Sequence, residues 1–161
     1  MPQVIIFCEE AEDMKMFELD RRKGLIKLGM ENVDDLWHLY NLLMPDDVVQ
    51  ARTTREIKSK GEGNRPDEGR RVSMELTIKV TDVSLDKNLN RIRIRGVVTD
   101  APERYDGVKG SYHTLSIQPN STIKIQKQKL ADHELKRIHY ACRVTEHPII
   151  IISIDDEDVC I

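Results

Sequence analysis

Apolar and polar residues alternate through much of this chain, which is the pattern of strands that bury one face. The clearest run lies between Val72 and Val80, where every second residue is apolar and so falls on one side of an extended backbone. Shorter alternating runs predict further strands at residues 17–28 (two strands around a turn at Arg22-Lys23-Gly24), 48–57, 91–98, 111–117 and 122–125. The pattern predicts a set of short, twisted antiparallel strands.

A capped helix is predicted between Asn32 and Pro45. Asn32 can cap its start, Asp34 and Asp35 suit the positive end of its dipole, and Pro45 ends it. One apolar stripe at helical spacing consists of Val33, Leu36, Trp37, Tyr40 and Leu43. The sole tryptophan is therefore predicted to lie in the core rather than to stack on a base, and His38, off the stripe, is predicted to be exposed. A second helix is predicted at residues 131–143.

These elements predict a mainly β protein with helices (α+β), and a small twisted barrel hides its strand edges economically. Its predicted range is residues 14–143, after an extension at residues 1–13 that we expect to be disordered or to result from a misassigned start codon. At residues 149–154 the pattern changes to a nearly continuous apolar run, which is typical of a sheet buried on both faces. Residues 147–161 are therefore predicted to open a second, truncated α/β domain.

Composition restricts the function classes. The 161 residues carry a formal net charge of −3, and 33% of them are charged, so any surface that binds nucleic acid must be local rather than uniform. The three cysteines are far apart and lack metal-ligand spacing, which indicates neither a disulfide framework nor a zinc site. No apolar run is long enough for a signal peptide or a membrane span. A soluble protein in the cytoplasm is expected.

The strongest candidate chemistry is a row of arginines at residues 91–95. Extended backbone places Arg91, Arg93 and Arg95 on one face and two isoleucines on the other. The row can meet a phosphate backbone, or it can be a solvated face balanced by acids on a neighbouring strand. The long loop at residues 58–69 can share a side of the barrel with this row. The basic residues at or beside this loop are Arg52, Arg55, Lys58, Arg70 and Arg71.

The residues alone support binding better than catalysis. Aromatic residues make up 4% of the chain, so recognition of RNA shape and phosphates is a better match than a stacking platform. A metal-dependent nuclease needs converging carboxylates, and the acidic pairs here have no specific spacing. His113 is expected to be a strand residue rather than a general base.

Four segments closely resemble the archaeal pelota family: residues 24–28 (GLIKL), 34–41 (DDLWHLYN), 90–96 (NRIRIRG) and 107–115 (GVKGSYHTL). The resemblance extends from Met14, near which family members begin, to the end of the chain. It implies an Sm-like N-terminal barrel, followed in the family by two domains akin to those of a class 1 release factor. Most of that following region lies beyond Ile161.

The resemblance also implies a function. Family members act in mRNA surveillance and no-go decay: they recognise stalled ribosomes and work with an elongation-factor-like GTPase to separate the subunits. The basic loop, here residues 58–71, would face mRNA and ribosomal RNA, and the protein would act as a monomer away from membranes. Some members are also credited with RNA cleavage that depends on a divalent metal cation. For that alternative, Glu18 and Asp20 match acidic positions of the family and are the candidate catalytic residues.

Overall fold

The computed structural model describes residues 13–57, 70–143, 153–154 and 159–160. Its strands are β1 (Lys15–Asp20), β2 (Leu25–Met30), β3 (Val48–Ile57), β4 (Arg70–Asp86), β5 (Arg91–Asp100), β6 (Tyr112–Ile117), β7 (Ser121–Gln126), β8 (Ser153–Ile154) and β9 (Val159–Cys160). Its α-helices are α1 (Val33–Leu42) and α2 (Asp132–Ala141), and a short 3₁₀ segment, η1, spans Glu103–Val108. Neither α-helix of the described part is long and apolar enough to cross a membrane.

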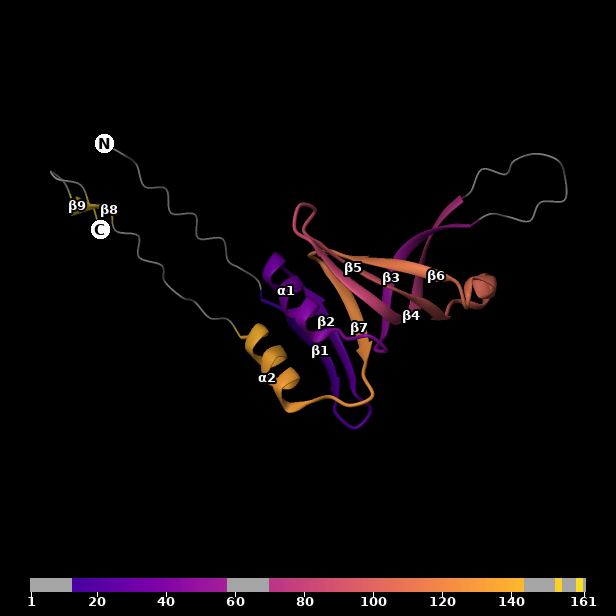
Figure 1. Ribbon diagram of the computed structural model, residues 1–161, viewed down its shortest axis with the longest axis horizontal. Helices are drawn as coiled ribbons and strands as arrows, with labels where there is room; N and C mark the ends of the chain where they lie inside the picture. The colour runs from indigo at the N-terminus through magenta and orange to yellow at the C-terminus, as the bar shows by residue number, and fades with distance from the viewer. Residues whose placement is uncertain (1–12, 58–69, 144–152, 155–158, 161) are drawn as a thin grey trace.

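Seven strands form one antiparallel sheet in the order β1-β2-β7-β3-β4-β5-β6 (Figure 1). The protein is mainly β with helices, as the alternation predicts. The backbone ladder does not close, because β1 and β6 are edge strands. The sheet nevertheless curls: on β6, His113 Nε2 lies 3.0 Å from the Oγ1 of Thr53 on β3, and Ser111, just before β6, accepts a hydrogen bond from Arg55.

Strand β4 is long enough to serve two partners. Its first part pairs with β3 and its last part with β5, and irregularities at Thr77–Ile78 and Val80–Asp82 interrupt the ladder with β5. Gly96 lies opposite Val80, where an added Cβ would collide with the carbonyl oxygen of Lys79. Glycine is needed there because the two backbones approach closely.

Helix α1 begins as predicted but faces the core differently. The side chain of Asn32 accepts a hydrogen bond from the Asp35 N–H, and the Asp35 carboxylate accepts one from the Asn32 N–H, which completes a capping box. The buried residues of the helix and its C-cap are Asp35, Leu36, Leu39, Leu42 and Leu43. The predictions for Trp37, which is 50% exposed, and for His38, which is half-buried, were therefore wrong.

The physical reason is that this helix is apolar on two sides. Both sets of residues recur at helical spacing, so periodicity does not decide which one faces the sheet. His38 is covered because α2 packs beside α1, with the His38 and Tyr140 ring centroids 6.0 Å apart in an edge-on arrangement. That contact joins residues far apart in sequence and leaves no trace in the local pattern.

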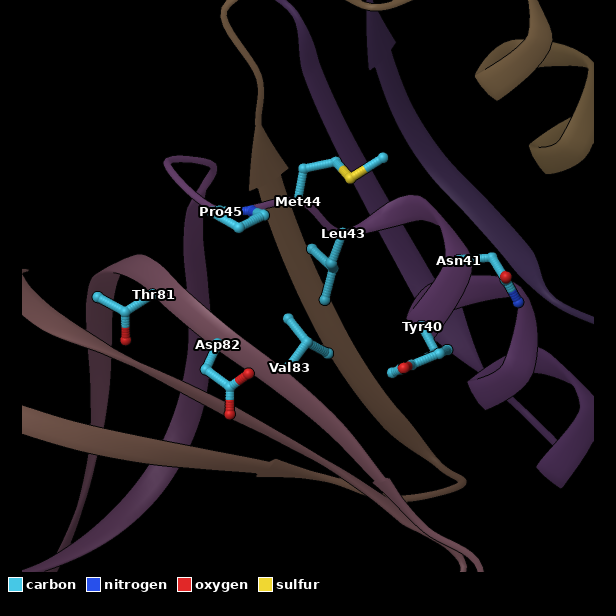
Figure 2. A pocket seen from close by; sticks show the side chains of 8 residues that line it. All are labelled: Tyr40, Asn41, Leu43, Met44, Pro45, Thr81, Asp82 and Val83. Atoms are coloured by element: carbon cyan, nitrogen blue, oxygen red, sulfur yellow. The ribbon is translucent and has the colours of Figure 1, made fainter.

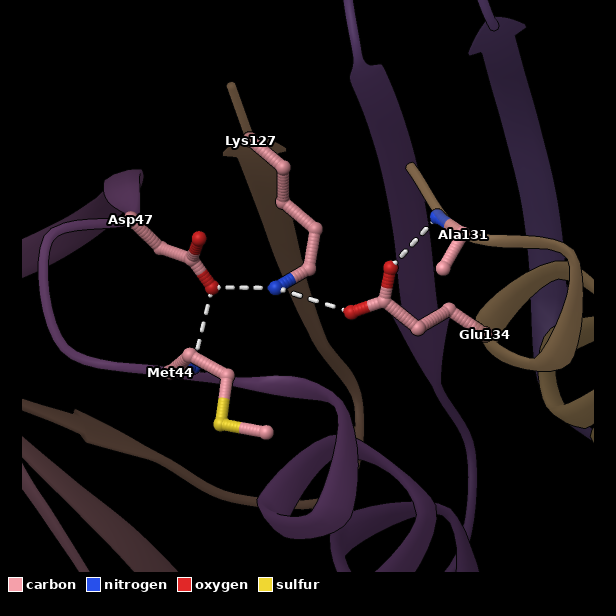
Figure 3. A network of polar contacts seen from close by, with 5 residues as sticks. All are labelled: Met44, Asp47, Lys127, Ala131 and Glu134. Atoms are coloured by element: carbon pink, nitrogen blue, oxygen red, sulfur yellow. Dashed lines mark hydrogen bonds and ion pairs between the residues drawn. The ribbon is translucent and has the colours of Figure 1, made fainter. Parts of the chain in front are cut away.

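A buried lysine attaches α2 to the sheet (Figure 3). The Lys127 side chain is 4% exposed, and its Nζ lies 2.5 Å from Asp47 Oδ2 and 3.1 Å from Glu134 Oε1. Each carboxylate also accepts a backbone N–H, from Met44 and Ala131 respectively. The network joins the turn after α1 to the first turn of α2, and its charges are paired, as buried charges must be.

The predicted domain boundaries remain predictions. Residues 1–12 and most of the apolar run at residues 149–154 lie outside the described part of the chain. Within residues 153–160, the short strands β8 and β9 pair antiparallel.

Candidate nucleic-acid interface

The arginine row lies on the outer face of β5. Ile92 and Ile94 are fully buried beneath it, as the alternation predicts, and Arg93 and Arg95 are exposed. Arg91 is half-buried and paired, since its Nη2 and Nε each lie 3.2 Å from Asp86 Oδ2. Within the described residues, an ion pair with an acid of the neighbouring strand is thus present for one member of the row.

Arg93 and Arg95 are the free cations of the row. Ser84 lies opposite Arg93, and Asp82 lies opposite Arg95 in the register of β4 and β5. Within the described residues, neither arginine forms an ion pair. They can therefore meet an external phosphate without first breaking an internal bond.

The other predicted basic residues differ in how free they are. Arg52 is exposed and donates from Nε to Ser73 Oγ at 3.0 Å, and Arg71 is exposed. Arg55 is half-buried; its Nη2 donates to Ser111 Oγ at 2.9 Å, and its buried Nη1 has no hydrogen-bond partner in the described structure. Lys58 and the side chain of Arg70 lie outside the described part.

The arginine row and the basic residues of β3 and β4 are far apart along the sheet. Along β4, position 71 and position 84, which faces Arg93, are 13 positions apart, or roughly 40 Å of strand path at about 3.3 Å per residue. The curl of the sheet brings Arg55 to the start of β6, where its Nη2 reaches Ser111. Arg55 is half-buried on the same face of β3 as Thr53, whereas Arg95 and Thr114 face outward from β5 and β6.

A hollow of about 480 Å³ lies at this junction of β5 and β6, and the described residues lining it are Arg95, Tyr112, His113 and Thr114. Burial, and then the nearby charge of Arg55, lower the pKa of His113, so its imidazole is neutral at pH 7. Tyr112 is 71% exposed. Sequence reasoning did not select this tyrosine, although the alternation at residues 111–117 already places it on the outer face.

A second hollow of about 340 Å³ separates the end of α1 from β4 (Figure 2). Leu43 and Val83 point toward one another inside it, and Met44 and Pro45 lie along one side. Tyr40, another lining residue, stacks on Trp37 with ring centroids 5.9 Å apart. The charged residue lining it is Asp82. This mixture of apolar and acidic groups does not suit a phosphate backbone.

The candidate catalytic carboxylates have different surroundings. Asp20 Oδ1 accepts the backbone N–H groups of Arg22 and Lys23, so it caps the turn between β1 and β2. Glu18 is exposed and lies opposite Lys27. In the described residues, no group of three or more His, Cys, Asp or Glu side chains is placed to hold a metal ion.

The outer face of β5 and β6 thus offers a cationic surface with hydrogen-bonding groups and the exposed ring of Tyr112.

Comparison with known protein families gives a match to the Pelota N-terminal domain over residues 11–142. A pelota homolog from Staphylothermus marinus is 47% identical over 125 residues, which cover 78% of this chain and 34% of that protein. One from Desulfurococcus amylolyticus is 36% identical over 148 residues, covering 92% and 40% respectively. The chain thus spans between a third and two fifths of the length of these relatives.

Solved structures agree with the sequence comparison. A model of ribosome-bound archaeal Pelota and ABCE1 matches 90% of this chain and 41% of its own, with a TM-score of 0.69 and 27% identity. The crystal structure of Archaeoglobus fulgidus Pelota matches 81% of this chain and 32% of its own, with a TM-score of 0.55 and 30% identity.

Proposed function

Because this chain belongs to the pelota family, we propose that its sheet domain is the ribosome- and mRNA-facing binding module of a ribosome rescue factor that recognises stalled ribosomes. The observation that supports this most directly is the pair of exposed arginines, Arg93 and Arg95, which have no ion-pair partner in the described structure. The similarity to a Pelota described as ribosome-bound supports the same choice of partner.

The mode of recognition follows from the side chains. Guanidinium groups on a rigid strand contact phosphates and backbone shape, and such contacts carry little sequence information. The module would then bind structured RNA, or the mRNA of a stalled ribosome, wherever the ribosome exposes it. An elongation-factor-like GTPase is proposed as the partner of the longer protein, beyond the residues of this chain.

RNA cleavage is not proposed as the function. Asp20 is engaged in a turn, and the described residues assemble no metal-binding group. The role of Glu18 and Asp20 in cleavage remains a prediction from the resemblance.

The test is binding of the full chain to archaeal small ribosomal subunits and to a fluorescent single-stranded RNA over a series of salt concentrations. Arg93→Glu and Arg95→Glu should each weaken binding and lower the slope of log K against log salt by about 0.7 for each phosphate that is no longer neutralised. Arg91→Glu should have a smaller effect, since Arg91 is already paired with Asp86.

Arg137→Glu is the matched control, because it makes the same charge change on an exposed residue of α2. If Arg93→Glu and Arg95→Glu bind no more weakly than Arg137→Glu, the assignment of the β5 face is wrong. If the unaltered chain binds neither probe, the proposed function itself is wrong.

A further inference from the structure

The hollow at the β5–β6 junction contains chemistry that binding to phosphates alone does not use. Tyr112 is the most exposed large apolar or aromatic side chain of the described part, at 71%. An exposed ring of this kind offers apolar surface that a ligand can cover favourably. Within the lining, the ring lies on the same sheet face as the free cation Arg95.

Strand register fixes the spacing of these two groups. Arg95 pairs with Thr114 and Val97 with Tyr112, so Arg95 and Tyr112 are diagonal neighbours on adjacent strands, about 7–8 Å apart at the backbone. Long side chains at this separation can act on one ligand together. A nucleotide can use this combination, with the cation on its phosphate and the aromatic face on its base.

Thr114 suits an uncharged, hydrogen-bonding part of the ligand, because it pairs with Arg95 and offers its hydroxyl on the same sheet face. His113 lies on the opposite face, since side chains alternate along β6, and its Nε2 contacts Thr53 there. The lowered pKa keeps its ring neutral, so it adds no charge beneath the site.

Size is compatible with this ligand. The hollow measures about 480 Å³, within the range of about 300–1,000 Å³ that is usual for sites that take small organic ligands. It is open to solvent on one side, so a nucleotide could enter while still joined to the strand that carries it.

We propose that this hollow binds one unpaired nucleotide, with its base stacked on Tyr112 and its phosphate on Arg95. This inference rests on the proposed function, since it makes the hollow the place where the RNA-facing surface receives a base. It adds a stacking contact to a surface that otherwise reads only phosphates. Binding there requires an unpaired base, because a base inside a duplex cannot reach the ring.

The test compares Tyr112→Ala, Tyr112→Phe and the unaltered chain by fluorescence anisotropy with a short oligoadenylate. Tyr112→Ala should weaken binding about tenfold with an unchanged salt slope, and Tyr112→Phe should bind as the unaltered chain does, because the ring and not the hydroxyl stacks. An abasic oligomer of the same length should bind equally to the unaltered chain and to Tyr112→Ala. Tyr140→Ala, which removes an exposed tyrosine from α2, is the matched control.

The two proposals fail in different ways. If Tyr112→Ala binds oligoadenylate as tightly as Tyr140→Ala does while Arg93→Glu still weakens binding, the nucleotide site is wrong and the cationic surface stands. If the unaltered chain binds no RNA, both are wrong. Circular dichroism of each variant checks the fold, which the exposed position of Tyr112 should leave intact.

Discussion

Replacing Lys127 with methionine tests the buried network that joins α2 to the sheet. Methionine keeps most of the length and the apolar volume of the lysine stem but removes the ammonium group. The Asp47 and Glu134 carboxylates, which the ammonium group bridges at 2.5 Å and 3.1 Å, would then lie in the interior with no cation between them.

The expected loss is about 3 kcal/mol of unfolding free energy. Removing one partner of a buried ion pair costs about 3–5 kcal/mol, because the other charge stays buried without compensation. The lower end applies here, since the backbone N–H groups of Met44 and Ala131 still donate to the two carboxylates. With a urea dependence of about 1–3 kcal/mol per molar, the midpoint should fall by about 1–3 M.

Urea denaturation followed by circular dichroism measures this loss, and Lys79→Met is the control. The Lys79–Asp46 distance, 2.8 Å, lies between the two contacts of Lys127, but both side chains of this pair are more than half exposed, so its loss should cost less than about 1 kcal/mol. Adding Asp47→Asn and Glu134→Gln to Lys127→Met should recover at least half of the loss, because amide oxygens still accept the two N–H groups. A midpoint for Lys127→Met no lower than that of Lys79→Met would refute the reasoning.

Two further predictions concern burial and pH. Leu36→Ala, in the core, should lower the unfolding free energy by about 2–5 kcal/mol. Trp37→Ala, on the exposed side of α1, should lower it by less than about 1.5 kcal/mol, mainly through loss of the stacking on Tyr40. Equal losses in urea denaturation would contradict the orientation of α1. Burial and Arg55 lower the pKa of His113, so the unfolded chain takes up this proton more readily. The stabilisation from His113 is therefore complete above its unfolded pKa near 6.5 and is lost as pH falls from there through its lower folded pKa. His113→Gln should flatten the decline in melting temperature between about pH 7.5 and about pH 5.5, and an unchanged profile would count against this shift.

Local patterns were sufficient for the parts of the fold that local physics decides. Alternation places Ile92 and Ile94 in the core and the arginines outside, and cap chemistry identifies Asn32 as the start of α1. Local patterns failed where a distant strand or helix decides which residues are buried or paired. The pairing of Arg91 with Asp86 depends on the β4–β5 register, and Trp37 lies outside because the sheet covers the other apolar side of its helix.

The candidate site shows the same division. The two strands that line the hollow, β5 and β6, were both predicted from the sequence. The position of the hollow depends on the curl of the sheet, which brings β6 against β3 through the contact between His113 and Thr53. No periodicity reports such a contact, because the two residues are 60 positions apart. An exposed tyrosine next to an arginine strand was readable from the alternation, and only the register shows that Tyr112 and Arg95 border the same hollow.

The electrostatics of the β5 face explain why a stacking contact matters. Asp86 compensates Arg91 and Asp82 faces Arg95, on a chain with a net charge of −3. At physiological salt, charges farther apart than about 8 Å are screened, so the β5 face offers two local cations, Arg93 and Arg95, rather than a broad positive field. Two phosphate contacts give a salt slope of only about 1.4 in magnitude. Affinity at cellular salt would then depend largely on base stacking, which salt does not weaken and which the Tyr112 ring can supply. A much steeper salt slope would place the main phosphate contacts elsewhere on the chain.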